Sequence, residues 1–454
     1  MAKYKAYPEY KDSGVEWLGE VPNHWKTISI SRLFSRVKRT GYTEKELLSV
    51  YRDYGVIPKS SRDDNNNKPS EDLSPYQLVQ PNDLVMNKMK AWQGSIAISE
   101  YEGIVSPAYF VYQPNNSLFE LAHPKYVHYL LRNPIYVTQY LSRSKGIRVN
   151  QWDLDPDEFR NIEILLPSKV EQEKIYSFLD HETAKIDNLI EKQQQLIELL
   201  KEKRQAVISL AVTKGLNPDV PMKDSGVEWL GDVPEHWGIT KLKWVGRTTS
   251  GGTPTTSKFE IYYEDGHIPW IRTTDLNNGE LFDTPIRITS KAVNDTACSI
   301  LPVGSVLLGM YGGAGSIGKH AILRFESTIN QAVCGVLPCG RILPDFLHKY
   351  YEFYRPFWMI DAAGTRKDPN IGQDNIKEGI ILIPPFEEQV EINNHIDNMR
   401  NIYECIIENA LEGMDLLQER RTALISAAVT GKIDVRDWVA PETQDVEEPQ
   451  EVTA

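Results

Sequence analysis

The residues of this chain best suited to binding chemistry are basic, amide and aromatic side chains in segments expected to form loops. Arginine and lysine can pair with phosphates or reach guanine O6 and N7, and asparagine suits adenine. One such position recurs, because Gly146-x-Arg148 is repeated as Gly364-x-Arg366. The candidate DNA-binding residues are Lys88, Lys90, Trp92, Arg143, Lys145, Arg148, Arg272, Thr274, Asn277, Tyr311, Lys319, Arg366 and Lys367.

Two motifs suggest catalysis, but their surroundings argue against it. Residues 313–318 spell G-x-G-x-x-G, the dinucleotide fingerprint, which needs a following helix to hold the pyrophosphate. The KHAILRFES that follows predicts a strand, so a tight hairpin is the better interpretation. Residues 383–386 (IPPF) resemble an amino-methyltransferase motif, yet Ile383 replaces the polar group that would hold the amine. Prolines that open a helix explain this segment.

Other catalytic signatures are missing from the sequence. It contains no H-E-x-x-H, Walker loop or G-x-S-x-G. Carboxylate pairs such as Asp63-Asp64 lie in polar stretches, where solvated side chains are expected. The chain is therefore predicted to have no catalytic residues and no metal site.

The chain contains a tandem duplication. KDSGVEWLGEVPNHW (11–25) returns as KDSGVEWLGDVPEHW (223–237), with 13 of 15 positions identical. Later segments recur in the same order, and LLKEKRQAVISLAVTKG (199–215) matches LLQERRTALISAAVTGK (416–432). A repeat of this length indicates two copies of one structural unit.

Each copy ends in a predicted long helix, one over 168–215 and one over 385–432. Ser168 and Glu171 make a capping box, and Gly215 with Pro218 ends the first helix. Two heptad rows run along it and shift by 217 onto the second helix, which predicts an antiparallel coiled coil about a pseudo-twofold axis. The first row is Leu179, Ile186, Gln193, Leu200 and Val207, and the second is Glu182, Leu189, Leu196, Lys203 and Leu210.

The expected architecture is α+β, with two pseudo-symmetric globular α/β domains separated by these helices. The predicted domains are 1–167, 216–384, the two helices, and an acidic tail over 433–454 that is mostly disordered. Residues 385–454 hold 5 Lys and Arg against 16 Asp and Glu, which is −11 of the total −13. The globular halves are therefore close to neutral, and charge leaves DNA binding possible without supporting it.

The bulk composition indicates a cytoplasmic protein. No apolar run is long enough to span a membrane, and the N-terminus lacks a signal-peptide core. The four cysteines form no C-x-x-C pair, which fits a reducing compartment better than a disulfide framework.

The chain resembles the specificity subunit of type I restriction–modification enzymes over about residues 8–438. The resemblance rests on the repeated KDSGVEWLG-x-VP-x-HW, on LLPSKVEQEKI and LIPPFEEQVEI, on the two helix ends, and on IPWIRTTDL and GSIGKHAI. It implies two target-recognition domains that each read half of a split DNA site, with the helices setting the spacing. It also implies two modification subunits that bring S-adenosylmethionine for adenine methylation, and restriction subunits with ATP and Mg, so that no cofactor belongs to this chain.

Two other functions remain open from the residues. A coiled-coil scaffold that joins two protein-binding domains would show no DNA sequence preference. A self-contained adenine methyltransferase would transfer methyl groups alone. The globular regions differ strongly between the repeated motifs, so the two half-sites are expected to differ in sequence.

Overall fold

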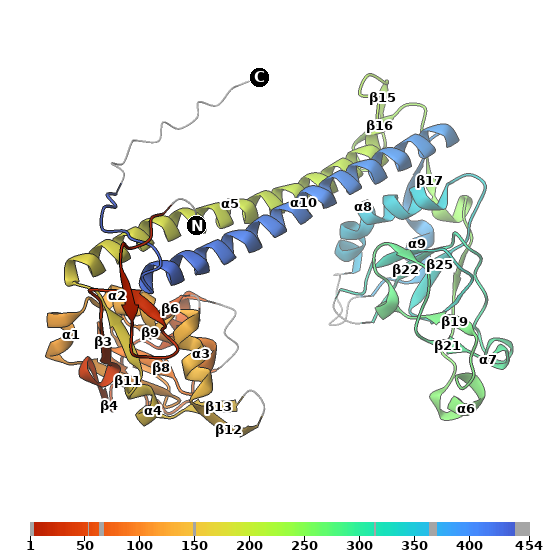
Figure 1. Cartoon of the computed structure of the whole chain (residues 1–454). Coiled ribbons are helices and arrows are strands. Elements are labelled where there is room, and N and C mark those ends of the chain that lie inside the picture. The colour runs from red at the N-terminus through yellow and green to blue at the C-terminus, as the bar shows by residue number, and fades with distance from the viewer. Residues whose placement is uncertain are drawn as a thin grey trace. The chain divides into compact units, whose positions relative to one another are not determined.

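The computed structural model describes residues 4–52, 54–62, 68–148, 151–312, 315–362 and 370–440 (Figure 1). The chain forms two compact units. The first unit comprises Met1–Gln193 and Glu412–Ala454, and the second comprises Gln194–Leu411. Each unit therefore contains one globule with part of both long helices, a different division from the predicted one, which treats the helices as separate domains.

The long helices are α5 (Lys169–Lys214) and α10 (Phe386–Val429), which lie within the predicted ranges 168–215 and 385–432. Half of the predicted capping box forms, because Ser168 Oγ accepts from Glu171 N at 3.3 Å. Gly215 and Gly431 follow the two helix ends with φ of +76° and +73°, a conformation that glycine adopts without a Cβ clash.

In the first unit, the repeated motif forms the hairpin of β1 (Tyr10–Asp12) and β2 (Glu20–Pro22). The residues that follow this hairpin contact the first turn of α5. The buried Glu171 carboxylate accepts from Tyr7 Oη (2.6 Å) and Trp25 Nε1 (3.0 Å), and His24 Nε2 lies 2.8 Å away. Its carboxylate thus serves the motif rather than the expected capping box. Burial and the bond to Glu171 raise the pKa of Tyr7, so the hydroxyl remains a donor.

The neighbouring glutamine fixes a second segment. Gln172 Oε1 accepts from His123 N at 2.8 Å, and its amide donates to the carbonyls of Leu121 and Pro167 at 3.1 and 2.9 Å. The first turn of α5 is therefore hydrogen-bonded to two parts of its globule: to the repeated motif through Glu171, and to the segment between α1 and α2 through Gln172.

The second unit repeats this arrangement. The hairpin of β15 (Met222–Asp224) and β16 (Asp232–Pro234) precedes His236 and Trp237. Trp237 Nε1 donates to Glu388 Oε2 at 3.0 Å, and His236 Nε2 lies 2.8 Å from the same oxygen. Gln389 binds Leu343 N at 2.7 Å. The repeated histidine and tryptophan therefore share one structural role, the attachment of each globule to the start of its helix.

The helices are antiparallel within each unit. In the first unit Arg421 donates to Asp187 at 2.8 and 3.2 Å, and in the second unit Arg204 lies 3.7 Å from Glu404. A shift of 217 carries Asp187 onto Glu404 and Arg204 onto Arg421. Each unit thus contains the same ion pair with the roles of the two helices exchanged.

In the first predicted seam row two residues are buried and the other three are half-buried, whereas the second row is wrong. Leu179 and Ile186 are buried, whereas Leu189, Leu196 and Leu210 are 48%, 40% and 57% exposed. Other apolar residues of α5, including Ile197 and Ile208, fill the interior instead. The helices consequently leave apolar side chains on their surface.

The first globule contains a four-stranded sheet of order β4-β11-β8-β9. Its remaining strands form two-stranded sheets that include β14-β3, β10-β7, β5-β6 and β12-β13. The strands after β2 are β3 (Lys26–Ser29), β4 (Phe34–Val37), β5 (Leu48–Tyr51), β6 (Gly55–Pro58), β7 (Gln77–Val79), β8 (Leu84–Asn87), β9 (Ile96–Ile98), β10 (Gly103–Val105), β11 (Tyr109–Pro114), β12 (Ser144–Arg148), β13 (Gln151–Leu154) and β14 (Glu163–Leu166). The helices are η1 (Ile30–Arg32), η2 (Lys59–Ser61), η3 (Ala91–Gln93), α1 (Asn116–Leu121), α2 (Pro124–Leu131), α3 (Pro134–Ser142) and α4 (Pro156–Arg160).

The second globule repeats this sheet as β18-β25-β22-β23, with β20 added, and adds a three-stranded sheet β21-β19-β24. Its strands are β17 (Gly238–Lys241), β18 (Thr248–Ser250), β19 (Ile268–Ile271), β20 (Glu280–Leu281), β21 (Arg287–Ile288), β22 (Val306–Gly309), β23 (His320–Leu323), β24 (Thr328–Ile329), β25 (Val333–Val336) and β26 (Ile380–Ile383). Its helices are η4 (Leu242–Trp244), η5 (Thr256–Lys258), α6 (Phe259–Tyr262), η6 (Thr273–Asp275), α7 (Ser290–Asp295), α8 (Pro344–Ala362) and α9 (Gln373–Glu378).

The G-x-G-x-x-G segment joins β22 to β23, which pair antiparallel through Leu308 and His320. A strand, rather than the helix that a dinucleotide site needs, follows this segment, as predicted.

The predicted tail begins too early. Ile433 and Val435 are buried in the first unit's core, and Trp438 packs edge-on against Phe178 with ring centroids 5.6 Å apart. Residues 441–454 lie outside the described part of the chain. None of the described helices is long and apolar enough to cross a membrane.

Replacing Glu171 by Ala should destabilise the first unit. The change leaves the buried donors of Tyr7 and Trp25 without their acceptor, and each unpaired buried donor costs about 1–3 kcal/mol. We expect the free energy of unfolding to fall by at least about 2 kcal/mol, measured by urea denaturation. The control is Glu173→Ala, an exposed position on the same turn. Equal stability of the two variants would contradict the structural role of Glu171.

Candidate nucleic-acid interface

In the first unit, several of the predicted DNA-binding residues lie where η3 meets the β12–β13 hairpin. The sequence predicts a loop in place of this hairpin. Leu154 N donates to Lys88 O at 3.2 Å, and the rings of Trp92 and Trp152 lie 5.0 Å apart at 61°. These contacts fix the hairpin beside η3. We call the set Lys88, Lys90, Trp92, Arg143 and Lys145 the hairpin surface.

The members of the hairpin surface differ in what they can do. Lys90 and Lys145 are exposed and can reach a phosphate. Trp92 is half-buried, and its Nε1 donates to Met89 O at 2.9 Å, so it supports the hairpin. Arg143 donates to Gln139 on the preceding helical turn. Arg148 ends β12, but its side chain lies outside the described residues.

In the second unit, three chain segments meet at the end of β19. Asn330 N donates to Ile271 O at 2.9 Å, Tyr311 Oη donates to Gln331 O at 3.0 Å, and Thr253 bonds to Gln331. We call the set Thr253, Arg272, Thr274, Tyr311 and Gln331 the strand-end surface. It contains three predicted residues, Arg272, Thr274 and Tyr311.

Two predicted residues lie at the neighbouring β20–β23 end. Asn277 donates to Glu280 O at 3.0 Å and accepts from Gly279 N at 2.9 Å, so its amide is used to shape a turn. Lys319 is half-buried and directly precedes β23. Arg366 and Lys367 lie outside the described residues.

The sequence reasoning missed a basic and aromatic cluster in the first unit. The Arg62 guanidinium lies 4.4 Å from the Tyr54 ring centroid and 5.5 Å from that of Tyr51. Arg52 directly follows β5, as Arg272 directly follows β19. The signal was available, because the two arginines lie 220 residues apart, the same shift that carries His128 onto His348.

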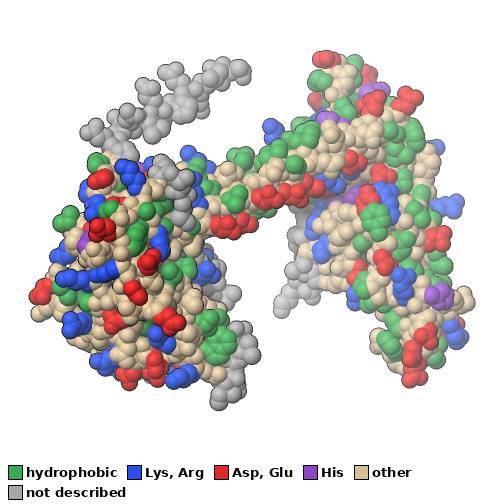
Figure 2. Space-filling view, viewed as in Figure 1, with side chains coloured by type: hydrophobic (Ala, Val, Ile, Leu, Met, Phe, Trp, Pro, Cys, Tyr) green, Lys and Arg blue, Asp and Glu red, His purple; other side chains and the backbone are tan. Residues whose placement is uncertain are grey.

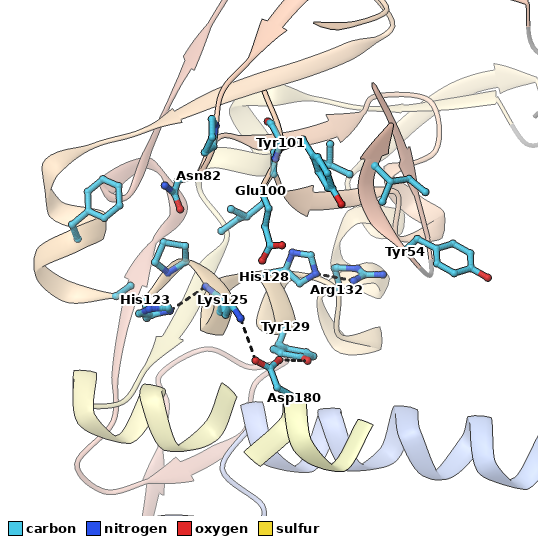
Figure 3. Close-up of a pocket in the computed structure, with 18 of the residues that line it drawn as sticks. Tyr54, Asn82, Glu100, Tyr101, His123, Lys125, His128, Tyr129, Arg132 and Asp180 are labelled. Atoms are coloured by element: carbon cyan, nitrogen blue, oxygen red, sulfur yellow. Dashed lines mark hydrogen bonds and ion pairs between the residues drawn. The ribbon is translucent and has the colours of Figure 1, made fainter. Parts of the chain in front are cut away.

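A cavity of about 760 Å³ in the first unit is lined by residues of β6, β9, α2 and the neighbouring loops, and by three residues of the long helices (Figure 3). Tyr129 donates to Asp180 at 2.7 Å, and Lys125 lies 3.3 Å from the same carboxylate. Arg132 bonds to His128 Nε2 at 2.8 Å. These contacts join α2 to α5, so the cavity marks an attachment of the globule and is not assigned a ligand.

Histidines occupy equivalent helices of the two units: His128 on α2 is half-buried and lines this cavity, whereas His348 on α8 is buried. Burial and the charge of Arg132 lower the pKa of His128 to about 3, and burial and Arg400 lower that of His348 to about 3. The His348 ring lies 4.7 Å from His320, whose pKa is also lowered, chiefly by burial. These imidazoles are therefore neutral at physiological pH, which removes them as candidate cations for DNA.

The family model for the type I restriction modification DNA specificity domain matches the chain twice, over residues 22–199 and 234–412. The chain belongs to this family. The EcoKI specificity subunit of Escherichia coli is 22% identical over 446 residues, 93% of this chain and 92% of that protein. The MjaIX specificity subunit of Methanocaldococcus jannaschii is 30% identical over 196 residues, but that match spans 42% of this chain and 43% of the relative.

Solved structures share the fold of this specificity-domain protein. A chain from work on complex assembly and conformational transition of the type I R-M system matches with a TM-score of 0.67 at 15% identity, over 91% of this chain and 99% of that one. The HsdS subunit of Thermoanaerobacter tengcongensis matches with a TM-score of 0.55 at 16% identity, over 91% and 98%. The predicted fold and family are thus confirmed.

Acidification should destabilise the second unit through His348. An unfolded histidine binds a proton near pH 6.5, whereas the folded residue stays neutral down to a pKa of about 3, so stability falls as pH drops through this window. At pH 5 the loss is about 2 kcal/mol for this residue. His348→Phe should reduce the difference in unfolding free energy between pH 7.5 and 5 by this amount, whereas the exposed His395→Phe should not. Identical pH profiles for wild type and His348→Phe would contradict the assignment.

Proposed function

We propose that this chain is the DNA specificity subunit of a type I restriction–modification complex. It reads a bipartite, asymmetric DNA site through two target-recognition domains and is itself non-catalytic. The observation that carries the proposal is the double match to the DNA specificity domain over two units with the same scaffold.

The two half-sites differ in sequence under this proposal. The units share the four-stranded sheet and the helix attachment, but the surfaces that they present are built differently. The first unit offers the hairpin surface with its exposed lysines, and the second offers the strand-end surface beside the additional sheet β21-β19-β24. Different side chains over a common scaffold suit recognition of different bases.

Modification subunits are proposed to dock on the long helices. Leu189 and Leu416 are exposed in the first unit, and Figure 2 shows hydrophobic side chains along the helices. Within the second unit, the exposed large apolar residues of the two long helices are Leu196, Leu199, Leu210, Phe386, Val390, Ile402, Ile406 and Leu411. Apolar stripes of this kind fit partner helices.

The rest of the complex is inferred from the family. Two modification subunits supply S-adenosylmethionine, and restriction subunits supply the ATP- and Mg-dependent steps. A cytoplasmic location agrees with the described cysteines, which are all free.

Electrophoretic mobility tests this proposal against a scaffold and an autonomous enzyme. The chain co-expressed with its modification subunit should retard unmethylated DNA in a sequence-dependent way, and it should transfer no methyl group when the modification subunit is omitted. A scaffold would show no sequence preference in either preparation. Methyl transfer by the chain alone would identify it as an enzyme.

Lys90→Ala and Lys145→Ala should weaken DNA binding by a similar factor at every sequence, because exposed lysines on the hairpin surface contact phosphates. Each lost contact lowers the slope of log affinity against log salt by about 0.9. Fluorescence anisotropy of the complex over a salt series measures the slope. Lys185→Ala on α5 is the control. A change confined to particular bases would instead assign these lysines to sequence reading.

A further inference from the structure

Arg272 and Asp275 form a rigid pair at the end of β19. Asp275 Oδ2 accepts from the backbone N of Arg272 at 2.8 Å and from its Nε at 3.2 Å, while Oδ1 accepts from Nη2 at 3.1 Å. The carboxylate is therefore fixed by the main chain of the residue whose guanidinium it holds. This arrangement sets the orientation of the Arg272 side chain before any ligand binds.

The Asp275 carboxylate binds one edge of the Arg272 guanidinium and leaves another edge open to a ligand. Asp275 binds the Nε–Nη2 edge, and among the described residues no hydrogen-bond partner faces Nη1. Arg272 is 37% exposed, whereas Asp275 is 12% exposed. The free Nη1–Nη2 edge presents two parallel N–H donors, the geometry that matches two adjacent acceptors.

We propose that Arg272 reads a guanine of one half-site in the major groove, with Asp275 as its positioning residue. This inference rests on the proposed function and names a base for it. Guanine presents O6 and N7 as the acceptor pair that an arginine fork matches. Because Asp275 already restricts the side chain, less conformational freedom is lost on binding.

The surroundings favour a base edge over a phosphate. The Asp275 carboxylate lies against the guanidinium and repels a second anion bound on the opposite edge, whereas guanine is neutral. The neighbours Thr274, Tyr311 and Gln331 on the strand-end surface are also neutral polar groups. The hairpin surface, by contrast, presents exposed lysines, the residues suited to phosphate contacts.

The guanidinium of Arg272 is not needed to stabilise this turn. Asp275 caps η6 through the backbone N of Arg272, but the Arg272 side chain is 37% exposed, so its own ion pair adds little to stability because water screens it. Substitution of Arg272 should therefore leave the fold intact and expose a specific effect on DNA.

The test is selection from a randomised duplex DNA library by the complex with the modification subunit, followed by sequencing. Wild type should enrich guanine at one position of one half-site. Arg272→Ala should lower the preference for guanine at that position by about 5- to 150-fold, while the base preferences of the other half-site stay unchanged. Arg272→Lys keeps the charge without the fork, so it should lose most of the preference. Asp275→Asn should weaken it several-fold.

The control is Arg287→Ala, which removes another half-exposed arginine paired with Asp283 in the same unit. It should leave every base preference unchanged, and melting temperatures and co-purification of the modification subunit verify folding. If wild type selects sequences but Arg272→Ala weakens binding to all of them equally, the inference is wrong and the proposed function stands. The same holds if the base whose preference is lost is not guanine. If wild type selects no sequence, both are wrong.

Discussion

A glutamate in the first turn of each long helix holds its globule in place. Glu171 and Glu388 each accept from a tryptophan Nε1 and lie 2.8 Å from a histidine of the repeated motif. Glu171 is buried and Glu388 is partly exposed, and a carboxylate removed from water is stable only when such donors surround it. This constraint explains why the motif is nearly identical in the two copies, while the surfaces that it supports differ.

The elements with local signals could be predicted from the sequence. The long helices have caps and heptad spacing, and the repeated motif implies a repeated hairpin. The second seam row could not be predicted, because heptad spacing shows which residues are apolar but not which face the partner helix covers. Leu189 and Leu196 are exposed, while Ile197 is buried. The packing of Ile433 and Val435 was also hidden, since their partners come from the opposite end of the chain.

The candidate interface could be predicted in part. Basic and aromatic loop residues indicated both surfaces, but residue type does not show how a side chain is used. Trp92 supports a hairpin and Asn277 shapes a turn, and both depend on backbone groups that the sequence does not position. Arg52 was missed, although it lies 220 residues before Arg272, the same separation as between His128 and His348. The assignment of individual residues to DNA remains a prediction.

The chain combines two kinds of residue: those that attach each globule to the helices, and those proposed to face DNA. The central claim is that two dissimilar readers act on one site. Methylome sequencing of a host that carries this chain with its modification subunit tests the claim most directly. The account predicts adenine methylation at a single split motif with two unequal specified halves and an unread gap of constant length. An uninterrupted motif, or two identical halves, would contradict it.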